Sequence, residues 1–247
     1  MSKVEDYQEI PRQTEDWEEY LLRESRLPGR RANIELATAA AEEGDAEWFG
    51  HLLSFDVAIA PVNTPYEFLA FCGALGQGKL LEEGDLKAMR TLRLCASDSR
   101  WRMREAVAMA LHRYGRADME ALLVEMAGWS AGNLLERRAA AARPCHPELL
   151  VEVDKAERVL QLLDQITQSL LEEPDRRSAD YKTLSKALGY CWSVAVAAQP
   201  DIGKPFMERW MVDEDLGVRR IMIQNLKKKR LDRADSEWTE TWIDFLN

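Results

Sequence analysis

The run DSRWRMREAVAMALHRYGRADMEALLVEMAGW, residues 98–129, decides the fold class. Asp98 precedes a segment whose apolar stripe is Met103, Ala106, Val107, Ala110 and Leu111. Steps of three and four residues predict an amphipathic helix over about 99–114, with Asp98 as its cap. A second helix, over about 118–129, is predicted to follow Asp118. The short connection between them predicts antiparallel neighbours.

The same pattern recurs along the rest of the chain. Thr64-Pro65-Tyr66-Glu67 is a helix start signal, with Thr64 as N-cap. We expect that helix to reach about Leu75 and to break at Gly76 and Gly78. Asn133 caps another, which ends at Arg143-Pro144. Further helices are predicted over about 14–26, 31–43, 45–54, 85–96, 147–172, 179–198, 202–211, 215–230 and 236–246. Alternating strand patterns are missing, so the predicted class is all-α.

Composition and charge restrict the class of protein. The chain has 247 residues, 46% hydrophobic and 31% charged, which is typical of a folded core. Its formal charge of −10 argues against a surface devoted wholly to nucleic acid. The N-terminus lacks a signal-peptide pattern, no stretch suits a membrane span, and the four cysteines form no Cys-x-x-Cys pair. We expect a cytoplasmic protein with reduced thiols.

Familiar chemical motifs are missing from the sequence. It holds no Gly-x-Ser-x-Gly, no phosphate-binding Gly-Lys-Ser/Thr loop and no dinucleotide fingerprint. The three histidines, His51, His112 and His146, are far apart in sequence and have no ligand three or four residues on. The sequence therefore predicts no cofactor, no metal and no confident catalytic residue.

A faint repeat indicates stacked helix pairs. Asp98 is followed by Met103-Arg104, and Asp213 by Val218-Arg219, with the same spacing. Arg138 lies 34 residues after Arg104 and precedes three alanines. In each pair we expect the Asp to cap the second helix and the Arg to reach an acidic group on an adjacent repeat.

On these runs the chain resembles HEAT-like repeat proteins, including bacterial ones without an assigned activity. The segments LPGRRANIEL, SRWRMREAVAMAL, LGYCWSVAVAA and IMIQNLKKKRL carry the resemblance. It implies a right-handed α-solenoid of antiparallel helix pairs, an armadillo-like superhelix. We expect one repeat domain over 1–247, with divergent helices over 1–97, clearer repeats over 98–231 and a capping helix over 232–247.

A second, more distant resemblance is to HEAT-like alkylpurine DNA glycosylases, which act in DNA alkylation repair. Trp101, then Arg137-Arg138-Ala139, then Lys186-Ala187-Leu188-Gly189-Tyr190 follow that family's motif order. The family's catalytic Asp would fall near Arg102 or Glu105, and Tyr190 stands where the family has Trp. The resemblance implies an aromatic, arginine-edged cleft and leaves base excision weak or lost.

The candidate site residues each allow two interpretations. Trp101 and Tyr190 can stack on nucleobases or fill gaps between helix pairs, whereas Trp192 follows an apolar run and is interpreted as core. Glu105 is the candidate catalytic residue, an acid/base or an electrostatic stabiliser, and is alternatively a helical partner of Arg102. Arg104 and Arg138 are candidate partner-binding residues.

Two basic stretches, and an aromatic segment near each end of the sequence, also allow two interpretations each. The arginines over 100–116 can contact phosphates or form a solvated face balanced by the acidic N-terminus. The basic run 227–230 can likewise contact phosphates, or it can complement the dipole of a helix that ends there. The aromatic helices around Trp17 and Trp238 are predicted to cap the solenoid, with packing on partner chains as the alternative.

The favoured function is a non-enzymatic scaffold or binding protein that presents a concave surface to a macromolecular partner, foremost a protein. The alternative is a DNA-binding relative of the glycosylases with weak or lost catalysis. Its binding face would contain Trp101, Arg104, Glu105, Arg138 and Tyr190. No membrane partner is expected.

Overall fold

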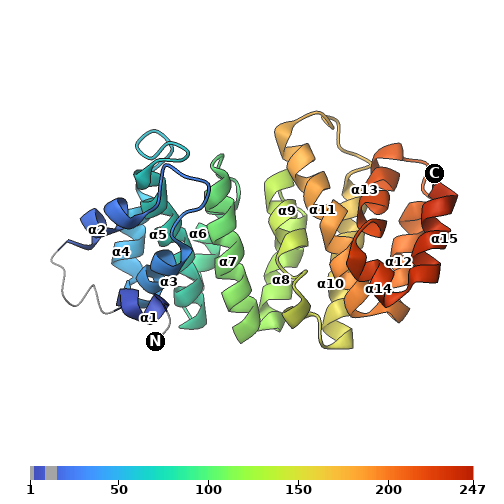
Figure 1. The fold of residues 1–247 in the computed structure, drawn as a ribbon, viewed down its shortest axis with the longest axis horizontal. Helices are drawn as coiled ribbons and strands as arrows, with labels where there is room; N and C mark the ends of the chain where they lie inside the picture. Colours follow the sequence, from blue (N-terminus) through green and yellow to red (C-terminus); the bar gives the residue numbers. More distant parts are fainter. Residues whose placement is uncertain (1–2, 9–15, 247) are drawn as a thin grey trace. The chain divides into compact units, whose positions relative to one another are not determined.

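The computed structural model describes residues 3–8 and 16–246. Every regular element within those residues is helical, so the all-α prediction is confirmed. None of these helices has both the length and the apolar character that crossing a bilayer requires. The helices fall into two compact units, Met1–Ala117 and Asp118–Asn247 (Figure 1). The predicted single repeat domain stays a prediction.

The first unit is built around one buried helix. Its helices are α1 (Lys3–Gln8), α2 (Trp17–Glu24), α3 (Ile34–Glu43), α4 (Ala46–Leu53), α5 (Pro65–Glu82), α6 (Lys87–Ala96) and α7 (Trp101–Ala117). Helix α5 packs against α2, α3, α4, α6 and α7, and its residues 68–72 are wholly buried. A helix covered on all sides is apolar around its circumference, as this one is. The stripe predicted on α7 is buried as expected.

Two glycines of α5 serve close packing. The expected break at Gly76 and Gly78 is wrong, because α5 continues to Glu82. A Cβ on Gly76 would lie 2.4 Å from the Phe49 ring, and one on Gly78 would lie 2.8 Å from the Ala110 Cα. The glycines thus let α4 and α7 approach α5, and this packing outweighs their low helix propensity.

The second unit has two layers of helices. Its elements are α8 (Met119–Ser130), α9 (Leu134–Ala142), η1 (Pro147–Leu149), α10 (Val153–Ser169), α11 (Ala179–Ala198), α12 (Pro200–Met211), α13 (Leu216–Leu226), α14 (Lys229–Ala234) and α15 (Ser236–Leu246). Helices α9, α11 and α13 pack side by side, and α8, α10 and α12 lie against them. Helix α11 is central, as predicted. Its Trp192 is fully buried and donates a hydrogen bond to Thr167 Oγ1 of α10 at 3.1 Å.

Two predicted helices are each divided. The expected helix over 147–172 is η1 followed by α10, because Gln199 Nε2 holds the non-helical link through the carbonyls of Leu150 (3.4 Å) and Val151 (3.2 Å). The expected helix over 215–230 is α13 followed by α14, with Lys228 extended between them. That turn lets Leu231 reach the core. The basic run therefore spans a junction and does not occupy the last turn of one helix.

Polar side chains begin the helices largely as predicted. Thr64 Oγ1 accepts a hydrogen bond from the Glu67 amide at 3.4 Å, and Asn133 Oδ1 accepts from the Leu135 and Glu136 amides at 3.0 Å. Asp118 caps α8 in the same way, but Asp215 caps α13, so the expected cap at Asp213 is wrong; Asp213 Oδ1 instead accepts from the Asp215 amide at 2.8 Å. Because each cap satisfies amides that lack a helical partner, these residues set where the helices begin.

Gly76→Ala should destabilise the protein, whereas Gly50→Ala should not. The added methyl at Gly76 meets the buried Phe49 ring, and overpacking of this kind costs about 1–3 kcal/mol. Gly50 is an exposed position of α4 with nothing within 4 Å of its Cβ, so alanine there should stabilise by up to about 1 kcal/mol. Denaturant unfolding of both variants measures the difference. Equal effects would show that Gly76 does not set the approach of α4 to α5.

Candidate functional site

Exposed basic and aromatic side chains gather on the layer that α9, α11 and α13 form. On α11, Lys182, Lys186 and Tyr190 are exposed and follow one another at every fourth residue. This spacing places them in a row along one face of the helix, with a rise of about 6 Å per step. The row ends at Tyr190, because the next residues of α11, 191–196, are buried.

Tyr190 lies beside two cations from the junction of α13 and α14. Its side chain is 47% exposed. The guanidinium carbon of Arg230 lies 4.2 Å from the ring centroid, and Lys228 Nζ lies 6.0 Å from it. Cation–π attraction at such distances holds the cations against the ring. The division of the predicted helix at Lys228 is what brings this basic run to Tyr190.

Helix α13 adds a second exposed row next to the first. Its exposed residues Arg220, Gln224 and Lys227 follow one face of the helix. Gln224 lies directly over Gly189 of α11, where an added Cβ would be 2.3 Å from Gln224 Oε1. We call this surface the Tyr190 face. It comprises Tyr190 with Lys182, Lys186, Arg220, Lys227, Lys228 and Arg230.

The six cations of the Tyr190 face make no ion pair within the described part of the chain. Other basic residues of the same unit do: Arg176 pairs with Asp215, Lys204 with Asp235 and Arg209 with Asp164. The protein as a whole carries a net charge of −10. Positive charge is therefore concentrated and left uncompensated on one face of an acidic protein.

Arg138 lies on α9, which packs against α11, and is half-buried. Its charge, with those of Arg143 and Arg230, acts on the thiol of Cys191, the residue after Tyr190. The pKa of Cys191 is lowered, first by a hydrogen bond from Cys145 and then, against burial, by these arginines. Arg138 and Tyr190, two of the predicted site residues, thus belong to one neighbourhood.

The other three predicted site residues share the first turns of α7, in the first unit. Trp101 is 46% exposed, and the Arg102 guanidinium carbon lies 4.4 Å from its ring centroid. Arg104 Nη1 donates hydrogen bonds to the carbonyls of Asp98 (2.6 Å) and Ser99 (3.1 Å). It therefore stabilises its own helix start, and the expectation that it reaches an acid on an adjacent repeat is wrong.

Glu105 is exposed and makes no ion pair within the described residues. The expected helical pairing with Arg102 is wrong, because Arg102 is buried and its Nη1 donates to Glu67 Oε2 at 2.9 Å. Arg102 Nη2 also donates to the Gly29 carbonyl at 2.7 Å. Desolvation makes the buried guanidinium depend on these partners.

The arginine-rich stretch 100–116 forms no common solvated face. Arg100 is buried and donates to Asp98 and to the carbonyls of Phe55 and Ala60. Arg113 pairs with Glu42 and Glu82. Arg100, Arg102 and Arg113 thus each bond to a distant segment of the first unit, although Arg102 Nε is buried without a hydrogen-bond partner.

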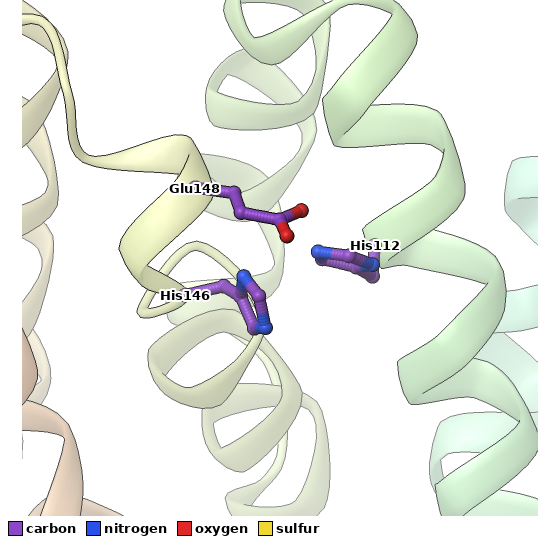
Figure 2. A group of neighbouring side chains, drawn as sticks. All are labelled: His112, His146 and Glu148. Atoms are coloured by element: carbon purple, nitrogen blue, oxygen red, sulfur yellow. The ribbon is translucent and has the colours of Figure 1, made fainter.

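Two further groups of residues were singled out from the sequence. Of the three histidines, His51 forms a 2.8 Å contact with Glu18, while His146 projects beside Glu148 from the turn of η1 (Figure 2). The absence of a metal stays a prediction. Trp238 of α15 donates to Glu208 Oε1 of α12 at 2.6 Å, so this end of the chain packs on its own unit.

One pocket of about 480 Å³ opens in the first unit, and its lining includes Ser99, Arg100 and Met103, the neighbours in sequence of Trp101 and Arg104. Its walls include Leu53, Val57, Leu94 and Met103. Cys95 also lines it, and burial raises the pKa of that thiol to about 12. Asp98 and Arg100 also line it, and they are paired with each other, because Arg100 Nη2 donates to Asp98 Oδ2 at 2.7 Å.

Comparison with known proteins assigns no relative: no family model, no curated protein and no solved structure matches this chain. Any function inferred for this protein therefore rests on the residues themselves. Sequence reasoning missed Lys182, Lys186 and Arg220 as site residues. The available signal for Lys182 and Lys186 was their spacing at every fourth residue along one predicted helix, in line with Tyr190.

Arg102→Ala should destabilise the protein by about 3–5 kcal/mol, because it leaves the carboxylate of Glu67 buried without its partner. The matched control is Arg90→Ala, which removes an exposed arginine without an ion pair and should change stability by less than about 0.5 kcal/mol. Urea unfolding of both variants gives the two values. A small loss at Arg102 would mean that Glu67 finds other partners.

Proposed function

We propose that this chain is a non-enzymatic, HEAT-like helical-repeat protein that binds nucleic acid on the Tyr190 face. The packing of α8 on α9, α10 on α11 and α12 on α13 supports the HEAT-like part of the proposal; a right-handed solenoid is the arrangement that we propose for these pairs. The four free thiols support a cytoplasmic location.

One observation carries the binding proposal: an exposed tyrosine shares its helices with six cations that form no ion pair with the described acids of the chain, and Arg230 and Lys228 lie beside its ring. Like charges held close together repel, and a polyanion relieves that repulsion while releasing its own counterions. Tyr190 adds a ring on which a base can stack, worth about 1–3 kcal/mol. Cations and aromatics interleaved in this way are typical of nucleic-acid surfaces.

The sequence alone favours a protein as the partner. A protein that fits the Tyr190 face would need an acidic surface to match its cations. Nucleic acid supplies both regular negative charge and rings that can stack on a tyrosine. An acidic protein surface supplies the negative charge alone. The combination of Tyr190 with Lys228 and Arg230 therefore favours nucleic acid.

The charge reversal Lys186→Glu with Arg220→Glu should weaken nucleic-acid binding strongly. The matched control is Lys87→Glu with Arg90→Glu, which makes the same charge change at exposed, unpaired positions of α6. Removing two phosphate contacts should also make the slope of log K against log salt shallower by about two. Fluorescence anisotropy at low and moderate salt measures both quantities.

The probes are a labelled single strand, an undamaged duplex and a duplex with an abasic-site analogue. If both double variants lose affinity equally, net charge alone drives binding and the Tyr190 face is not the site. If the wild-type protein binds none of the probes at low salt, nucleic acid is the wrong partner, and a protein-binding solenoid is left.

A second candidate function is weak base excision, as in the alkylpurine glycosylases. Its support is that Trp101 and the unpaired Glu105 are exposed one turn apart on α7. A carboxylate there can stabilise the positive charge that develops as an alkylated purine leaves. Release of alkylated bases by the wild type, lost in Glu105→Gln, would establish this function. No release by the wild type would exclude it.

A further inference from the structure

Helix α11 lies in the middle of a layer, with α9 packed on one side of it and α13 on the other (Figure 1). Packed helices have axes about 8–10 Å apart, so the outer axes of this layer are about 16–20 Å apart. Gln224 of α13 lies over Gly189, the residue before Tyr190, so α11 does not stand out from its neighbour there. The major groove of a duplex is about 12 Å wide and admits a single helix. The Tyr190 face therefore cannot enter it to reach paired bases.

The ring of Tyr190 is covered by a cation on one side. The guanidinium carbon of Arg230 lies over the ring, 4.2 Å from its centroid, and yet the side chain remains 47% exposed. A side chain that wedges between two base steps of a duplex must be open on both sides. Arg230 prevents this insertion. The ring is therefore suited to stacking on one base that is already unpaired.

The lysines of α11 suit the backbone of a strand that lies along this helix. Lys182, Lys186 and Tyr190 are exposed at every fourth residue, and together they span about 12 Å of the helix. Neither lysine forms an ion pair with the described acids of the chain. A strand that places a base on Tyr190 can therefore run its phosphates past Lys186 and Lys182.

We propose that the Tyr190 face binds single-stranded nucleic acid, with an unpaired base stacked on Tyr190 and phosphates on Lys182 and Lys186. This inference rests on the proposed function and narrows its ligand to a strand of DNA or RNA with unpaired bases. A duplex can lay its phosphates on the same lysines, but its bases stay paired and the ring of Tyr190 contributes nothing. The ring, and not the charge, therefore distinguishes the two ligands.

The test is fluorescence anisotropy of the full-length protein at low and moderate salt, with labelled probes of about 12 nucleotides. The probes are oligodeoxyuridylate, oligouridylate, a duplex and a strand of abasic residues, which keeps the phosphates without the bases. We expect each base-bearing strand to bind about 5- to 150-fold more tightly than the abasic strand, the factor that one stacked base supplies. A preference between the two base-bearing strands, which differ only in the ribose hydroxyl, identifies DNA or RNA as the source.

Tyr190→Ala should remove this advantage of the base-bearing strands. Their affinity should fall about 5- to 150-fold, while the duplex and the abasic strand bind as before. The salt slope should stay the same, because the substitution removes no charge. Tyr190→Phe keeps the ring and should keep the affinity. The matched control is Tyr66→Ala, since Tyr66 is 44% exposed on α5 with its ring stacked on Phe55 at 6.0 Å, and it should leave all probes unchanged.

The outcomes separate this inference from the proposed function. If no probe binds at low salt, the proposed function fails, and the inference fails with it. If the probes bind but Tyr190→Ala weakens none of them, or weakens the duplex as much as the strands, the proposed function stands and the single-strand inference is overturned. The comparison of the base-bearing and abasic strands uses the wild-type protein, so it decides the question even if Tyr190→Ala does not fold.

Discussion

A helix buried on every side can exist only if other helices cover its whole circumference, and both units are organised by this constraint. In the second unit, residues 191–196 of α11 are buried between α9 and α13, with α10 and α12 lying below. The earlier part of α11 is covered on one side only: Tyr181, Leu184 and Leu188 are buried, while Lys182, Lys186 and Tyr190 face solvent. The position of the Tyr190 face thus follows from how far along α11 its covering helices extend.

The basic residues of this protein form two groups, and burial separates them. Arg100 and Arg102 are removed from water, so each must find acceptors, and each does so within the first unit. The cations of the Tyr190 face keep contact with water and need no acceptor of their own. Desolvation makes an unpaired buried charge very costly, whereas exposure makes it tolerable and available to a ligand. Counting arginines along the sequence does not separate these cases.

Sequence periodicity predicted the fold better than the site. Apolar spacing gave the helices, their order and the central place of α11, and the caps at Thr64 and Asn133 were predicted because they depend on neighbours in sequence. Gly76 and Gly78 were misjudged, since the packing of Phe49 and Ala110 on them is a contact between distant segments. The division after α13 was missed for the same reason, because burial of Leu231 is a tertiary requirement.

The division between α13 and α14 at Lys228 also decides how residues 227–230 can act. In one continuous helix, residues 227–230 would have complemented a helix dipole and been explained by it. The turn at Lys228 instead brings Arg230 onto the ring of Tyr190, where a helix dipole offers no reason for it to stay. Because helices hold Lys186, Tyr190 and Arg220 at fixed backbone spacing, little of the backbone is left to be ordered on binding. A preorganised row of like charges suits a partner with regularly repeated anions better than one reacting centre, which needs groups of opposite character to converge.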